Sequence, residues 1–229
     1  MSLRPVPRPT GLFDGVVARL RRQITSGTWP VGSRIPTEPE LVAQLGVARN
    51  TVREAVRALA HNGLLDIRHG SGTYVAATSE LAGVMQRRFA DAEQRDVVEV
   101  RGSLEVTAAR VAALRRTAED LALLEKALRR REDAWENGGR DAFVDADAAF
   151  HLAVVAASHN EVLEALYTDL APVIRRSLRG HFDAGLRPED YMDHARLVAA
   201  IRAGDADAAA AEAASHLSGC RNAAPGPGR

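Results

Sequence analysis

Residues 47–56 read VARNTVREAV, and this stretch decides the fold of the N-terminal part of the chain. A helix repeats every ~3.6 residues, so Arg49, Arg53 and Arg57 fall on one face, with Asn50 beside them. The opposite face carries the apolar residues Val52, Ala55, Val56 and Leu59. The segment therefore predicts a short amphipathic helix whose outer face is cationic and rich in planar hydrogen-bond donors.

Turn and capping signals on both sides show what surrounds this helix. Residues 11–25 have helical apolar spacing, and Thr37 with Glu40 forms a capping box that starts a second helix, which Gly46 ends. After Asn62-Gly63 the stretch LLDIRHGSGTYVA changes to the period of a two-stranded hairpin. Three helices followed by a hairpin is the order of a winged helix-turn-helix domain.

The rest of the chain has only helical periods. Seven of them run from about residue 80 to residue 219, one over 188–203, so the expected fold is mostly α, with a C-terminal all-α bundle of six or seven helices. The expected boundaries are a flexible tail at 1–9, the winged domain at 10–76, a linker at 77–80, the helical domain at 81–221 and a second tail at 222–229.

Charge and composition narrow the class of protein. The formal net charge is zero, but residues 1–78 hold 10 Arg against 5 acids, and the remainder holds 20 basic residues against 25 acids. A basic N-terminal third indicates a polyanionic partner, the alternative being chance asymmetry between two solvated surfaces. One cysteine allows no intrachain disulfide, and no apolar run approaches the ~18 residues of a membrane span. We expect a cytoplasmic protein without membrane contact.

Residues 12–76, which include IPTEPELVAQLGVARNTVREAV, resemble the DNA-binding domain of the GntR family of bacterial transcription regulators. The resemblance implies that operator DNA is contacted by the residues Arg34, Arg49, Asn50, Thr51, Arg53, His69 and Gly70. Two positions depart from the family pattern, since Pro39 and Ala48 stand where many members have Arg and Ser. A contact is then missing or is supplied by Arg34 or Arg57. The alternative for the arginines is a solvated face paired with Glu54.

A second candidate site lies in the helical domain. Asp147 and His151 are spaced i, i+4 in DADAAFHLAVV, so they project from one helix face, and His194 and His216 follow in the last two expected helices. A set of three imidazoles and one carboxylate suits Zn²⁺, Ni²⁺, Mn²⁺ or Fe²⁺. On spacing alone, Asp145 and His159 compete for the same role.

The D-x-x-x-H pattern and the two later histidines resemble the FCD ligand domain of the FadR-like branch. The resemblance implies that Asp147, His151, His194 and His216 bind a divalent metal, with zinc as the first choice, at the floor of a helical cavity. It also implies that Arg101 holds the carboxylate of a small organic acid, unless it forms an exposed pair with Glu105. Asn160 contacts the effector or caps the next helix.

Together these features predict a ligand-responsive transcriptional regulator, a repressor by the resemblance, and not an enzyme. A recognition helix covers half of a site, so the protein should bind an inverted-repeat operator as a homodimer. Two alternatives stay open at this point. One is a metal-dependent enzyme that uses the same four residues, and the other is a regulator whose metal is purely structural.

Overall fold

The structure is a computed structural model that describes the backbone of residues 11–222 and the side chains up to His216. The tail expected at 1–9, and all but the first residue of the tail expected at 222–229, lie outside the described residues. The chain divides into two compact units, Met1–Arg87 and Arg88–Arg229. Each unit is described by itself below.

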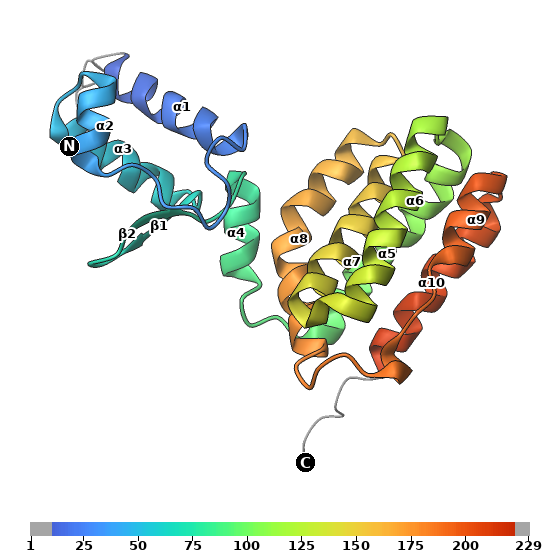
Figure 1. Cartoon of the computed structure of the whole chain (residues 1–229). Helices are drawn as coiled ribbons and strands as arrows, with labels where there is room; N and C mark the ends of the chain where they lie inside the picture. Colours follow the sequence, from blue (N-terminus) through green and yellow to red (C-terminus); the bar gives the residue numbers. More distant parts are fainter. Residues whose placement is uncertain (1–10, 223–229) are drawn as a thin grey trace, which may run out of the picture. The chain divides into compact units, whose positions relative to one another are not determined.

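The first unit has the expected winged helix-turn-helix order, drawn in blue and green in Figure 1. Its elements are α1 (Leu12–Thr25), α2 (Glu38–Leu45), α3 (Arg49–His61), β1 (Leu65–Arg68), β2 (Gly72–Val75) and α4 (Glu80–Arg88). The capping box is present, since the Glu40 carboxylate accepts from the Thr37 backbone nitrogen at 2.7 Å. Gly46 takes the left-handed conformation, with φ of 66°, that turns the chain from α2 into α3.

The core of this unit orients α3. Its apolar face is buried against α1 and α2, and the side chains Val52, Ala55, Val56 and Leu59 are at most 5% exposed. The hairpin pairs Leu65 with Val75 in antiparallel register, and Arg34 adds a single bridge to Tyr74. The polar face of α3 and the hairpin turn are therefore left at the surface of the unit.

The sequence suggested that the helix after the winged domain begins the second unit. In the structure this helix, α4, belongs to the first unit. α4 packs on the first unit, where the backbone of Gly83 lies against that of Gly63. The Glu80 carboxylate accepts from Arg21 at 2.6 Å and from Asn62 at 3.0 Å. The division between the units thus falls after Arg87 and not at the expected linker of residues 77–80.

The second unit is an all-α bundle. Its described elements are α5 (Gln94–Arg115), α6 (Ala118–Asp133), a π-helical turn (Ala134–Gly138), α7 (Gly139–Ala156), α8 (Glu161–His181), a 3₁₀ turn (Pro188–Asp190), α9 (Ala195–Ala203) and α10 (Ala206–Asn222). α7 packs against α5, α6 and α8, and α10 lies along α5 (Figure 1). No helix within residues 11–222 has the length and apolar character that crossing a membrane requires.

One expected helix of the bundle is shorter in the structure than the sequence predicted. The expected helix over 188–203 is a 3₁₀ turn at Pro188–Asp190 followed by α9, which begins only at Ala195, where the Asp193 carboxylate accepts from the Ala195 nitrogen at 2.7 Å. His194 is therefore the residue that precedes α9, and it lies at the end of the α8–α9 connection. Helical periodicity misses such a start, since the apolar spacing continues across the loop.

We predict that Gly83→Ala destabilises the first unit. A Cβ atom at this position would lie 2.4 Å from the Gly63 carbonyl oxygen, so the α4 backbone has to shift. Such overpacking costs about 1–3 kcal/mol, which urea unfolding measures.

Gly15→Ala in α1 is the matched control, because a Cβ there meets no atom within 4 Å. Removing a helical glycine without a clash should stabilise the protein by about 0.5–1 kcal/mol. Equal effects of the two substitutions would show that α4 does not need its close approach to Gly63.

Candidate functional site

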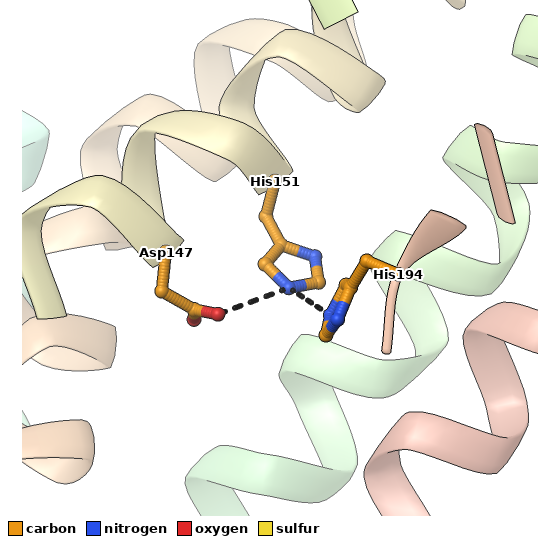
Figure 2. Close-up of side chains that lie close together, drawn as sticks. All are labelled: Asp147, His151 and His194. Carbon is orange, nitrogen blue, oxygen red and sulfur yellow. Dashed lines mark hydrogen bonds and ion pairs between the residues drawn. The ribbon is translucent and has the colours of Figure 1, made fainter. Parts of the chain in front are cut away.

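A compact group of metal-binding side chains lies inside the bundle. Asp147 and His151 project from α7 toward His194, which enters from the connection before α9 (Figure 2). One ligand atom of each residue lies within 4.8 Å of the others, and all three residues are at most 4% exposed. The i, i+4 spacing on α7 and the late start of α9 together create this group.

Hydrogen bonds decide which nitrogen of each imidazole is available. His194 Nδ1 lies 2.8 Å from the carbonyl oxygen of Met192, which only accepts, so Nδ1 carries the hydrogen and Nε2 the lone pair. His151 Nδ1 lies 3.2 Å from the Glu105 carboxylate, which selects the same tautomer. The two Nε2 atoms then face each other at 3.2 Å with lone pairs directed into the same space.

His216 also uses one ring nitrogen in a hydrogen bond and leaves the other free within the described part of the chain, but here Nε2 is the bonded nitrogen and Nδ1 the free one. Its ring stacks on that of His194 at 3.9 Å between centroids, and Nε2 donates to the Asp193 carbonyl at 3.0 Å. Nδ1 is buried and has no hydrogen-bond partner among the described residues. His216 is therefore an imidazole with an unpaired lone pair at the edge of the site, although it lies outside the compact group of three.

These donors fit a divalent transition metal. Two nitrogen lone pairs at 3.2 Å repel each other unless a cation lies between them, and ligands on one ion with bonds of ~2.1 Å are about 3 Å apart. Asp147 Oδ1 lies 3.8 Å from His151 Nε2 and supplies an oxygen donor. His216 lines the same cavity, and its unpaired Nδ1 is a candidate for a fourth ligand. The set contains no thiolate, which favours the borderline metals.

Two buried arginines hold the carboxylate of Asp147. Arg131 donates from Nε to Oδ1 at 2.7 Å and from Nη1 to the Met192 carbonyl, and its side chain is 1% exposed. Arg101 donates from Nη2 to Oδ2 at 3.3 Å. Sequence reasoning missed Arg131, because it lies among the charged residues of LRRRED, where nothing distinguishes it from exposed neighbours.

Glu105 completes the polar interior of the bundle. Its Oε1 accepts from Arg101 at 2.6 Å and from the Tyr167 hydroxyl at 2.5 Å. The sequence had left open an exposed pair between Arg101 and Glu105, and the pair exists, but both side chains are at most 7% exposed. Glu105 thereby orients both Arg101 and His151 from the side opposite the metal donors.

Burial and charge set the protonation of these groups. Burial and the nearby charge of Arg101 lower the pKa of His151 well below its ordinary value. Burial, Arg131 and His216 lower the pKa of His194 to about 3. Burial would raise the pKa of Asp147, yet contacts with His151 and the two guanidinium groups hold it well below the carboxyl range. The site therefore presents neutral imidazoles and an ionised carboxylate, the forms that bind metals.

The cavity beside these donors is small. Its volume is about 10 Å³, which is room for one water molecule, and its lining includes Arg101, Arg131 and all four predicted metal ligands. Aromatic rings close one side, where Trp135 meets Phe143 edge-on at 4.9 Å and Phe143 meets Phe182 at 5.3 Å. Any ligand larger than water requires this lining to move.

Three residues considered from the sequence do not lie with the group. Asn160 caps α8 by accepting from the Leu163 nitrogen at 3.1 Å, which is the alternative that the sequence had left beside an effector contact. Asp145 is exposed and pairs with Arg179. His159 is exposed and pairs with Asp120 at 2.7 Å. Spacing did not distinguish these residues from the buried ones.

The polar face of α3 forms a separate candidate site in the first unit. Arg49 and Asn50 are exposed, while Thr51 and Arg53 are half-buried in the first turns of α3. His69 and Gly70 lie exposed at the hairpin turn, and Gly70 has φ of 75°. The side chain of Arg34 packs against Gly72 near the hairpin. The face is thus cationic, with a glycine-containing wing beside it.

Glu38, which sequence reasoning did not single out, approaches both arginines of this face. Its Oε2 lies 3.3 Å from Arg49 Nε and 3.6 Å from Arg53 Nε. Arg49 and Arg53 are one turn apart, so a single carboxylate at the start of α2 reaches both. The i, i+4 spacing shows that Arg49 and Arg53 share one face. Whether Glu38 reaches that face depends on the angle between α2 and α3, which the sequence does not give.

We predict that Arg131→Met destabilises the protein and that zinc recovers part of the loss. Removing one partner of a buried ion pair costs about 3–5 kcal/mol, because Asp147 then keeps an uncompensated charge. A divalent ion at the neighbouring donors replaces that positive charge. Urea unfolding with zinc and with chelator measures both effects.

Arg130→Met is the matched control, because Arg130 is the preceding residue of α6 and is exposed. It should change stability by less than about 0.5 kcal/mol. If zinc stabilised the wild type and Arg131→Met equally, Arg131 and the metal would not share Asp147 as a partner.

Comparison with known proteins assigns both units. Residues 12–75 match the bacterial regulatory proteins of the gntR family, and residues 96–219 match the FCD domain. The galactonate operon transcriptional repressor of Escherichia coli K12 is 34% identical over 208 residues, which is 86% of this chain and 89% of the relative. The putative L-lactate dehydrogenase operon regulatory protein of the same organism is 30% identical over 223 residues, or 92% and 85%.

A solved structure agrees with this assignment. Streptococcus agalactiae GntR is 30% identical, with a TM-score of 0.55, over 93% of this chain and all of that chain. The matching families and these relatives are transcriptional regulators and not enzymes. This chain therefore belongs to the GntR family of transcriptional regulators and carries an FCD domain after its DNA-binding domain.

Proposed function

We propose that the protein is a cytoplasmic, homodimeric operon repressor. In this proposal it binds an inverted-repeat operator and responds to a small hydroxycarboxylate in the metal-containing pocket of the bundle. The observation that carries the proposal is the buried group of Asp147, His151 and His194, whose lone pairs converge beside two arginines. Zinc is the first candidate metal, and nickel, manganese and iron suit the same donors.

The charges of the pocket support an anionic effector. Arg101 and Arg131 balance Asp147 and Glu105, and Asp190, which also lines the pocket, pairs with Arg187. The protein's own charges around the pocket therefore cancel while the imidazoles are neutral. A divalent ion adds two positive charges to this interior. Buried charge without a partner is costly, so an anion that enters with the metal is favoured.

The chemistry of the donors narrows that anion to a carboxylate. A guanidinium fork matches the two oxygens of a carboxylate, and a metal accepts a carboxylate and an adjacent hydroxyl together. Two relatives are named for a galactonate operon and an L-lactate dehydrogenase operon. Galactonate and L-lactate are both hydroxycarboxylates. These points favour a hydroxy acid over an acid without a hydroxyl group.

The polar face of α3 supports operator binding. A winged helix-turn-helix domain places the start of its recognition helix, which is α3 here, in the major groove, where arginine bonds guanine with both fork nitrogens. Arg49 and Arg53 lie at that start, and His69 and Gly70 lie at the wing. One such helix covers one half-site, so a homodimer on an inverted repeat follows. The effector alters DNA affinity only by binding two arrangements of the protein unequally.

We predict that hydroxy acids weaken operator binding only when the pocket is intact and loaded with metal. The experiment measures binding to the DNA upstream of the protein's own gene, with zinc or chelator and with a panel of hydroxy acids. Asp147→Asn and His194→Gln should bind DNA normally and lose the response, because each removes a metal donor.

Asp145→Asn is the matched control, since Asp145 lies two residues before Asp147 and is exposed. It should keep the full response. If chelation lowered the melting temperature but no acid altered DNA binding, the metal would be structural and the effector proposal would fail. Chemical conversion of an acid would instead indicate an enzyme.

We predict that Arg49→Lys reduces discrimination between the operator and a scrambled duplex. Lysine keeps the charge but loses the fork, so specific binding should fall by about 1–3 kcal/mol while nonspecific binding keeps its salt dependence. Arg22→Lys on α1 is the control and should leave both affinities unchanged. Equal losses on operator and scrambled DNA would mean that Arg49 contacts only phosphate.

A further inference from the structure

A second small cavity lies beside the metal pocket and shares two lining residues with it. This cavity is also about 10 Å³, and it lies between the first turns of α5 and the last turns of α8. Arg101 and Leu178 line both cavities. Two water-sized spaces are thus separated by a layer that contains one arginine and one leucine side chain.

The far cavity has walls of a different character. Four of its lining residues are the apolar side chains Val97, Val98, Ile174 and Leu178. Gln94 and His181 stand at its polar end, where Gln94 Nε2 lies 3.3 Å from His181 Nδ1. The walls suit a carbon chain, while the amide and the imidazole each donate and accept hydrogen bonds.

The direction of a bound effector follows from what surrounds the metal donors. On one side the rings of Phe143 and Phe182 pack edge to face and are at most 3% exposed. On another side Arg101 is held by Glu105 and Asp147 through separate nitrogens. Because Arg101 and Leu178 line both cavities, an acid whose carboxylate replaces Asp147 at Arg101 can extend its remaining carbons past Leu178 into the far cavity.

We propose that the two cavities are parts of one effector site, and that Gln94 and His181 bind a hydroxyl or carbonyl group at the far end of an acid several carbons long. This inference rests on the proposed function, because it takes the metal and Arg101 as the binding place of the carboxylate. The far cavity then selects effectors by chain length and by the polar group at the end of the chain. Neither selection is possible in the metal pocket alone.

Calorimetric titration of the zinc-loaded full chain tests the proposal with three probes. Lactate is short, galactonate is long with distal hydroxyls, and 2-hydroxyhexanoate is equally long without them. Val98→Phe fills the far cavity, so it should weaken both long acids at least about tenfold and change lactate by less than about twofold. Gln94→Leu should weaken galactonate and leave 2-hydroxyhexanoate and lactate unchanged.

Val100→Phe is the control, because Val100 lies two residues further along α5 and is 52% exposed. It should leave all three affinities unchanged. The proposal is overturned if Val98→Phe weakens short and long acids equally, or if neither variant alters the long acids. Gln94→Leu decides the question alone if Val98→Phe does not fold. If no acid binds the zinc-loaded wild type, the proposed function fails and this inference with it.

Discussion

The carboxylate of Asp147 joins three helices of the bundle at one buried point. It extends from α7, accepts from Arg131 on α6 and from Arg101 on α5, and lies 3.8 Å from the imidazole of His151. Burial of an ionised carboxylate is costly unless such partners surround it, so these helices are tied to one arrangement around the pocket. In the proposed function the same carboxylate is a metal donor, and any ligand that changes its partners acts on all three helices. The pocket is thereby coupled to the packing of the bundle.

The histidines illustrate how partners outside the site prepare a metal centre. Each ring donates a hydrogen bond from one nitrogen to a separate acceptor. His151 donates to the Glu105 carboxylate, His194 to the Met192 carbonyl and His216 to the Asp193 carbonyl. The other nitrogen is then left as a lone pair, and burial keeps the rings neutral. Two of these acceptors are backbone carbonyls of the α8–α9 connection. The connection therefore supplies a ligand and also orients two rings, so its conformation and metal binding depend on each other.

The DNA-binding unit has an apolar core, and the side chains proposed to contact DNA lie at its surface, exposed or half-buried. Val52, Ala55 and Val56 pack α3 onto the core of the unit. Arg49 is exposed and Arg53 half-buried on the opposite face, with Glu38 beside both. Such exposed pairs contribute little to stability. They are also exchanged readily for phosphate or base contacts. α4 packs onto this unit through the close approach of the Gly83 and Gly63 backbones.

The sequence alone determined the winged order, the capping box of Thr37 and Glu40, and the shared face of Asp147 and His151, because these features depend on residues within a few positions of one another. Only the tertiary structure decided that Arg131 is buried, that His194 precedes α9, and that Asn160 caps a helix. It alone placed α4 with the first unit and brought Gln94 to His181. The physical reason is that the burial of a charge or a close approach of two backbones depends on partners far along the chain, as with Arg131 and the carbonyl of Met192. Periodicity records which face a residue occupies, but not what lies against that face.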